Sequence, residues 1–300
     1  MKVVLAGDIE AAEWQAWRKA LARALPEAVC LAPDEARGVA DEIMVAVVAN
    51  PPPGVLAPFR RLRLIQSLWA GVDRLLADET LPPGVPVARM VDPAMSAAMA
   101  EAALWAVLAL HRGFFDYQRQ QRESRWQQHR QRRADEVPVL VLGRGEMGGA
   151  VAGRLRALGY PVTAWGRDGP DLAPLLAAHE VVINLLPLTP STRGLLDARF
   201  FGAMPAGAAL VNFGRGGHVV DEDLLAALDR GHLRHAVLDV YRTEPLPASH
   251  RFWTHERVTM LPHAAALTDL RTASAVVAAN LRALQAGRPV AHLVDRDRGY

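Results

Sequence analysis

The sequence has almost no cysteine: Cys30 is the only one among 300 residues. A single thiol excludes an intramolecular disulfide framework and the cysteine clusters of structural zinc sites. The histidines, including His232 and His235, have no nearby Asp, Glu or Cys residues in a pattern that would complete a metal site. We therefore expect no bound metal.

An excess of charge of one sign is also lacking. The 34 Lys and Arg residues are nearly balanced by 32 Asp and Glu residues, so that the formal net charge is +2. A nearly neutral chain has no strong field for nucleic acid or for an acidic membrane surface. We expect neither of these partners.

Long uncharged apolar runs are absent. A membrane-spanning helix needs a window of about 18 such residues, and the longest candidate, residues 102–110, stops at His111 and Arg112. The apolar run at residues 3–6 is too short for a signal peptide. These features predict a cytoplasmic protein.

Short apolar runs alternate with helical patterns along most of the chain. The first set of runs covers residues 3–6, 43–49, 64–67 and 85–88. The second set covers residues 139–142, 162–165, 181–185, 209–213, 236–240 and 258–261. Such alternation predicts parallel sheets with helices on both faces. Two sets predict two α/β domains.

Two longer helical patterns flank the second set. Residues 96–128 are apolar at first and then rich in Gln and Arg, and we expect one long helix there whose charged end is a solvated face. Such a helix could connect the two domains and reach a partner subunit. A further helix is expected at residues 273–286, before Gly287.

Gly143, Gly145 and Gly148 form a Gly-x-Gly-x-x-Gly turn between a predicted strand and the helix at residues 150–158. In this context the first glycine makes the tight turn, and the second lets the backbone approach a pyrophosphate. The third lets the helix pack closely on the strand. Glu146 and Met147 fill the middle of the turn without a basic side chain, so phosphate binding is expected from the backbone.

The end of the following strand distinguishes the two nicotinamide cofactors. NAD-binding turns usually place Asp or Glu there for the ribose hydroxyls, whereas this chain has Gly166 and then Arg167. A carboxylate about 4 Å from a 2′-phosphate would cost roughly 4 kcal/mol at an effective dielectric near 20, and an arginine would be favourable. We expect NADPH to be preferred, with NADH as the alternative. Asp168 could neutralise Arg167, which would leave a solvated loop arginine.

Four further segments follow predicted strands in a fixed order: residues 185–189 (LLPLT), 211–217 (VNFGRGG), 238–247 (LDVYRTEPLP) and 261–265 (LPHAA). Together they closely resemble the D-isomer-specific 2-hydroxyacid dehydrogenases, and the resemblance covers nearly the whole chain. Residues 69–73 (WAGVD), 165–167 (WGR) and 294–300 (VDRDRGY) resemble the bacterial glyoxylate/hydroxypyruvate reductases of the A type.

The resemblance implies three catalytic residues. Arg215 would bind the carboxylate and ketone oxygens of a 2-oxoacid with its planar guanidinium. His263 would be the general acid, and Glu244 would pair with it and keep the imidazole protonated near neutral pH. The backbone of Trp69, Ala70 and Gly71 would bind the substrate carboxylate together with Arg215.

The resemblance also extends the cofactor site. The residues expected there are Gly143, Gly145, Glu146, Met147, Gly148, Gly166, Arg167, Leu186, Pro187, Phe213 and Asp239. The family further implies a homodimer, in which Trp126 would lie on a dimer arm near the neighbouring active site; the alternative is an ordinary interface aromatic.

The implied fold has two Rossmann-like or flavodoxin-like domains with a cleft between them. Residues 1–96 and 270–300 would form the substrate domain, and residues 97–269 the NAD(P)-binding domain. The implied reaction is reduction of glyoxylate to glycolate, or of hydroxypyruvate to D-glycerate, by NADPH. Two alternatives remain: a reductase of a bulkier 2-oxoacid, and a nucleotide-sensing regulator on the same fold.

Overall fold

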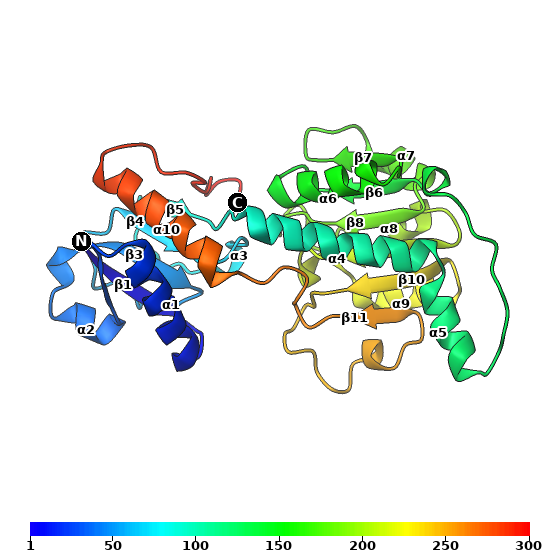
Figure 1. Cartoon of the computed structure of the whole chain (residues 1–300), viewed down its shortest axis with the longest axis horizontal. Helices are drawn as coiled ribbons and strands as arrows, with labels where there is room; N and C mark the ends of the chain where they lie inside the picture. Colours follow the sequence, from blue (N-terminus) through cyan, green and yellow to red (C-terminus); the bar gives the residue numbers. More distant parts are fainter. The chain divides into compact units, whose positions relative to one another are not determined.

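Two parallel β-sheets organise the chain, as the computed structural model of residues 1–300 shows (Figure 1). One compact unit comprises Met1–Ala94 and Thr268–Tyr300, and the other comprises Met95–Leu267. The two parallel sheets confirm the expected α/β fold class.

The first unit has the sheet order β2-β1-β3-β4-β5, which is the flavodoxin-like order. Its strands are β1 (Lys2–Gly7), β2 (Val29–Leu31), β3 (Ile43–Ala49), β4 (Leu64–Ser67) and β5 (Val87–Ala88). Its helices are α1 (Ala11–Ala24), α2 (Pro33–Arg37), α3 (Asp73–Leu76) and α10 (Leu270–Gln285). Strand β2 was not predicted, although residues 28–32 (AVCLA) are apolar; it is only three residues long, and none of the three is fully buried.

The second unit has a six-stranded sheet in the order β11-β10-β9-β8-β6-β7. The strands are β6 (Val139–Leu142), β7 (Val162–Trp165), β8 (Val181–Asn184), β9 (Ala208–Asn212), β10 (Leu233–Leu238) and β11 (Val258–Met260). The strand order reverses at β6, so the topological switch point lies between β6 and β8. Ligands of open parallel sheets bind at this point, beyond the carboxyl ends of the strands.

Helices cover both faces of this second sheet. They are α4 (Pro93–His111), α5 (Phe114–Arg122), α6 (Glu146–Ala157), α7 (Leu172–Ala178), α8 (Ala198–Ala203) and α9 (Asp221–Asp229). Alternate strand residues point to opposite faces. Val139 and Val141 pack with α4 and α6, whereas Leu140 and Leu142 pack with α7, α8 and α9. These two apolar layers account for the near-continuous hydrophobic strands of the sequence.

The prediction of a single helix at residues 96–128 is wrong. Helix α4 ends at His111, Gly113 has a φ of 72°, and α5 ends at Arg122. A left-handed glycine ends an α-helix at little cost. The segment after Arg122 is exposed at residues 123–131, as expected of a solvated stretch, but it is not helical, and Arg132 at its end forms an ion pair with Glu180 at 2.6 Å.

Helix α4 is long and apolar enough to cross a membrane by length and composition alone. A core helix passes the same test. In this chain Met99, Ala103, Val107 and Leu110 lie on one side of α4 and are buried in the core of the second unit. Its apolar composition is thus used in packing against the sheet.

Candidate active site

The predicted site residues of the second unit follow the carboxyl ends of its strands. The glycine turn follows β6, residues 185–187 follow β8, and Arg215 follows β9. Glu244 follows β10, and His263 follows β11. Because the carboxyl ends of parallel strands share one edge of a sheet, the predicted residues gather at one edge, with the glycine turn at the switch point.

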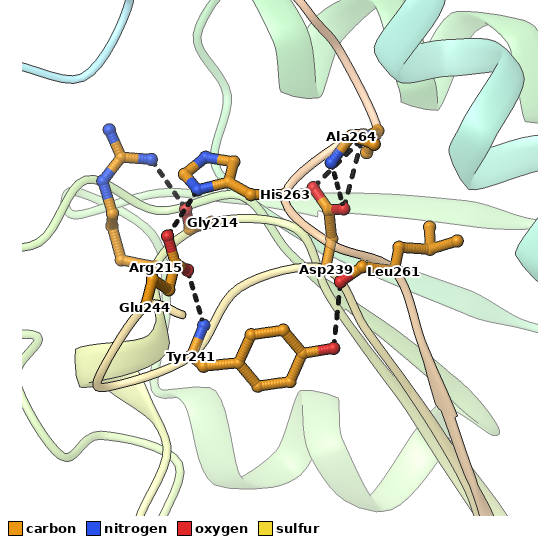
Figure 2. A network of polar contacts seen from close by, with 9 residues as sticks. Gly214, Arg215, Asp239, Tyr241, Glu244, Leu261, His263 and Ala264 are labelled. Carbon is orange, nitrogen blue, oxygen red and sulfur yellow. Dashed lines mark hydrogen bonds and ion pairs between the residues drawn. The ribbon is translucent and has the colours of Figure 1, made fainter. Parts of the chain in front are cut away.

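His263 and Glu244 form an ion pair. Nδ1 of His263 donates to Oε2 of Glu244 at 2.7 Å (Figure 2). The His263 side chain is half-exposed, with 52% of its surface accessible. Because the pair uses Nδ1, the Nε2 atom of the imidazole is left to serve a ligand.

Each partner of this pair changes the pKa of the other. The hydrogen bond to Glu244 raises the pKa of His263 above its usual 6.5, although burial and the charge of Arg215 oppose the shift. Burial raises the pKa of Glu244, but hydrogen bonds from His263 and from the Tyr241 N–H outweigh it and leave the pKa lowered. The pairing therefore favours the imidazolium form of His263 and the carboxylate form of Glu244.

Asp239 fixes the backbone that carries His263. Its carboxylate is 2% exposed and accepts hydrogen bonds from Ala264 N at 2.7 Å and from Ala265 N at 3.1 Å (Figure 2). The Asp239 carbonyl accepts the N–H of His263 at 2.8 Å. His263 is held in the left-handed region with a φ of 54°, which is costly for a residue with a side chain. The sequence did not reveal these hydrogen bonds, because the donor Ala264 lies 25 residues further along the chain than the acceptor Asp239.

Tyr241 positions Glu244 and was also missed from sequence. Its N–H donates to Oε1 of Glu244 at 2.8 Å, and its hydroxyl donates to the Leu261 carbonyl (Figure 2). The same hydroxyl lies 2.9 Å from the Leu238 carbonyl. Burial raises the pKa of this hydroxyl, which keeps it neutral. Tyr241 thus ties the loop of Glu244 to the ends of β10 and β11.

Arg215 lies next to the His263–Glu244 pair. Its Nη1 donates to the carbonyl of Gly214 at 2.9 Å, and its charge affects the pKa of both His263 and Glu244. The following Gly216 packs directly on the Tyr241 peptide: a Cβ atom on Gly216 would lie 1.8 Å from the Tyr241 carbonyl carbon. Only glycine permits this approach of the Arg215 turn to the Glu244 loop.

A buried network of hydrogen bonds holds the backbone of the Arg215 turn. Asn184 donates to Asn212 at 2.8 Å and to Nδ1 of His218 at 2.9 Å. Nδ1 of His218 also accepts the Arg215 N–H, and Asn212 donates to the Arg215 carbonyl at 3.1 Å. Since Asn184, Asn212 and His218 are all fully buried, loss of one partner would leave the others unsatisfied. This network connects β8 and β9 and was not visible in the sequence.

The glycine turn has the geometry of a pyrophosphate site. Gly143 has a φ of 117°, and a Cβ atom on Gly148 would lie 2.0 Å from the Gly143 carbonyl oxygen. In contrast, a Cβ atom on Gly145 would meet nothing within 4 Å, so the approach to the start of α6 is open. Unpaired N–H groups at a helix N-terminus favour a phosphate there. These residues fit a dinucleotide.

Arg144, which we did not predict as a cofactor residue, lies against Gly166, where NAD-binding turns usually have Asp or Glu. Gly166 is buried, and a Cβ atom built on it would lie 2.7 Å from Nε of Arg144. Arg144 belongs to the glycine turn, so the prediction that the turn offers no basic side chain overlooked it. Arg167 lies exposed in the adjacent tight turn, in which Gly169 N–H donates to the Gly166 carbonyl at 2.8 Å.

The remaining predicted cofactor residues lie between the sheet edge and the core. The Leu186 and Phe213 side chains are more than nine-tenths buried in the hydrophobic layers. The carbonyl of Pro187 accepts hydrogen bonds from Thr192 and His218. Their contact with a cofactor stays a prediction.

The predicted substrate loop belongs to the first unit and follows β4. The Trp69 N–H donates to the Ser67 hydroxyl at 3.0 Å, and the Trp69 carbonyl accepts the Met90 N–H at 3.0 Å. The N–H groups of Ala70 and Gly71 have no hydrogen bond within the chain. Of the three residues, these two therefore offer donors for a ligand.

The second unit thus has the fold and the ligand-binding edge of a dinucleotide-dependent oxidoreductase. Its residues 104–265 match the family described as D-isomer specific 2-hydroxyacid dehydrogenase, NAD binding domain. The chain belongs to the D-isomer specific 2-hydroxyacid dehydrogenase family. This finding confirms the resemblance seen in the sequence.

Curated relatives and solved structures are similar to this protein over most or all of its length. The glyoxylate/hydroxypyruvate reductase A of Serratia proteamaculans is 41% identical over 85% of this chain and 87% of that protein. A D-isomer specific 2-hydroxyacid dehydrogenase from Xanthobacter autotrophicus Py2, solved with NADPH and MES, has a TM-score of 0.92 and 37% identity, covering 100% of this chain and 99% of that one. An NADPH-dependent glyoxylate/hydroxypyruvate reductase from Sinorhizobium meliloti, solved with NADP and sulfate, has a TM-score of 0.92 and 30% identity over the same shares.

Proposed function

We propose that this protein reduces glyoxylate and hydroxypyruvate with NADPH, forming glycolate and D-glycerate. The observation that carries the proposal is the His263–Glu244 pair beside Arg215, at the sheet edge that also holds the glycine turn. The names of the Serratia and Sinorhizobium relatives support this substrate class. Both names contain glyoxylate and hydroxypyruvate, which are small 2-oxoacids.

The chain supplies binding and proton transfer in this reaction. When bound, the nicotinamide supplies the hydride. The Arg215 guanidinium binds the carboxylate and ketone oxygens of the substrate in a planar fork. His263 holds a proton on its imidazolium for the oxygen that becomes the hydroxyl, and Glu244 keeps that imidazolium charged before the transfer. We assign the free N–H groups of Ala70 and Gly71 to the substrate carboxylate.

The preference for NADPH is part of the proposal. A carboxylate for the ribose hydroxyls is absent at Gly166, and Arg167 is exposed in the next position. The complexes of the Xanthobacter and Sinorhizobium proteins with NADPH and NADP support the same preference. We expect Arg167→Ala to reduce the preference for NADPH over NADH.

We also propose that the protein is a cytoplasmic homodimer. Trp105, Phe114 and Trp126 expose 41%, 55% and 96% of their surfaces on α4, α5 and the segment that follows. Exposed aromatic residues are typical of protein interfaces. A cytoplasmic location fits an enzyme that draws on a soluble pool of NADPH.

Initial rates with glyoxylate, hydroxypyruvate and pyruvate, each with NADPH and NADH, test the proposed function. We expect the highest kcat/KM with NADPH and one of the first two acids. Equal rates with both cofactors would overturn the NADPH assignment. Tight dinucleotide binding with no turnover of any 2-oxoacid would instead indicate a regulatory protein.

A further inference from the structure

Arg144 is an unpaired cation in the middle of the cofactor turn. Its side chain is exposed and has no hydrogen bond or ion pair within the chain. It stands between Gly143, which follows β6, and Gly145, which precedes α6. The turn is fixed to the end of β7, because the Gly143 N–H donates to the Trp165 carbonyl at 2.8 Å.

The Arg144 guanidinium lies over Gly166. A Cβ atom on Gly166 would be 2.7 Å from Nε of Arg144 and 3.4 Å from its Nη2. Gly166 is buried although it belongs to a surface turn. Glycine at position 166 therefore does two things: it removes the carboxylate that would bind ribose hydroxyls, and it leaves the space in which the Arg144 guanidinium lies.

The turn after β7 carries a second arginine and is held by two hydrogen bonds. The Trp165 indole N–H donates to the Pro170 carbonyl at 2.8 Å, and Gly169 N–H donates to the Gly166 carbonyl. Arg167 and Asp168 are exposed in this turn. Together with Glu146 at the start of α6, these are the other charged residues of the two turns.

We propose that Arg144 is a specificity-determining residue that binds the 2′-phosphate of NADPH, alongside Arg167. This inference rests on the proposed use of NADPH and adds a residue to it. A phosphate at this place would meet a guanidinium from each turn, and arginine binds phosphate oxygens with two parallel N–H donors. NADH lacks the phosphate, so Arg144 contributes little to its binding.

Direct binding of two fragments tests this role without turnover. The probes are 2′,5′-ADP, which carries the 2′-phosphate, and 5′-AMP, which does not, each titrated calorimetrically into the full-length protein. We expect Arg144→Ala to weaken 2′,5′-ADP about tenfold, the typical scale of one charge-assisted contact, and 5′-AMP by less than about twofold. Equal loss for both probes would show that Arg144 contacts the adenosine 5′-phosphate that they share and not the 2′-phosphate, and no loss for either would also overturn the proposal.

Two further variants sharpen the test. Arg154→Ala removes the same charge from an exposed position further along α6 and should leave both probes within about twofold, because surface charges are screened over that distance. Gly166→Ala keeps both arginines but places a methyl group in the space of the Arg144 guanidinium. We expect it to weaken 2′,5′-ADP, but by less than Arg144→Ala does, because the exposed Arg144 side chain can shift. An unchanged affinity in Gly166→Ala would contradict the proposed position of Arg144.

The outcomes separate this inference from the proposed function. Selective, Arg144-dependent binding of 2′,5′-ADP by a protein that reduces no 2-oxoacid would support the inference and reject the function. Rapid NADPH-dependent turnover that is unaffected by Arg144→Ala, with unchanged 2′,5′-ADP binding, would reject the inference and leave the function intact. Because Arg144 makes no bond within the chain, the variant is expected to fold normally.

Discussion

At the scale of single residues, His263 depends on neighbours in the loop that follows β10, a different loop from its own. Glu244 raises its pKa, Asp239 holds its strained backbone through Ala264, and Tyr241 orients Glu244. None of these contacts involves residues adjacent in sequence. The imidazole is thus preorganised before any substrate arrives, which is how a proton donor gains efficiency.

Replacing Glu244 by Gln should change the pH dependence of reduction. Glu244 raises the pKa of His263, and reduction needs the protonated imidazole, so activity is lost as the pH rises through that pKa. In Glu244→Gln the hydrogen bond can remain, but the charge is gone, and the alkaline limb of kcat should move to lower pH. The exposed Glu222→Gln serves as the control. An unshifted limb in Glu244→Gln would reject the proposed pairing.

A second prediction concerns the glycine beside Arg215. Gly216→Ala places a methyl group against the Tyr241 peptide, so we expect a loss of about 2–4 kcal/mol in the free energy of unfolding and a strong loss of 2-oxoacid turnover. Gly153→Ala is the matched control, since a Cβ atom there meets nothing within 4 Å in the interior of α6. It should stabilise the protein by about 0.5–1 kcal/mol. Equal stability of both variants in denaturant titrations would contradict the packing described.

The sequence predicts residues of this site only where a local pattern carries them. Gly143, Arg215 and His263 lie in short segments that follow predicted strands. Arg144 also lies in such a segment, yet its relevance appears only from its position over Gly166. The roles of His218 and Tyr241 depend on contacts between loops, which no spacing along the chain reveals.

At the scale of elements, apolar runs located ten of the eleven strands. Buried parallel strands are hydrophobic on both faces, so their signal is strong. The edge strand β2 was missed although residues 28–32 are apolar, because a strand of three residues leaves only a short run. The long helix was predicted wrongly because the left-handed conformation of Gly113 and the Arg132–Glu180 pair outweigh the helical propensity of the Gln/Arg-rich stretch.

The packing of α5 on β10 should make stability depend on pH. His235 of β10 stacks on Phe115 of α5 with ring centroids 4.1 Å apart, and burial lowers its pKa to about 4. An unfolded histidine titrates near 6.5, so between these values the unfolded chain binds the proton more readily. The stability contribution is complete above pH 6.5 and is lost as the pH falls towards 4, by up to about 3 kcal/mol.

Denaturant titrations at pH 7.5, 6, 5 and 4.5 check this dependence. His235→Gln should flatten the pH slope, because the group that takes up the proton on unfolding is gone. His292→Asn, at an exposed position, should leave the slope unchanged. A wild-type slope that persists in His235→Gln would show that other groups cause it.

At the scale of the whole molecule, the proposed dimer can be tested by sedimentation. We expect a mass of twice 32.6 kDa for the wild type. Trp126→Ser removes the most exposed aromatic side chain of the proposed interface and should weaken dimerisation at least about tenfold if that residue is a hot spot. Trp253→Ser, at another exposed tryptophan of the same unit, is the control. A monomeric wild type, or equal effects of the two variants, would reject this surface as the interface.

The central claim is that His263 donates a proton while NADPH reduces a small 2-oxoacid. The most direct measurement is the rate of NADPH oxidation by glyoxylate with wild type and His263→Ala, together with the Kd of NADPH for both. We predict that the wild type forms glycolate and that the variant loses at least about 100-fold in kcat, while its Kd for NADPH changes by less than about threefold. Wild-type turnover in His263→Ala, or no NADPH oxidation by the wild type with any small 2-oxoacid, would contradict the account.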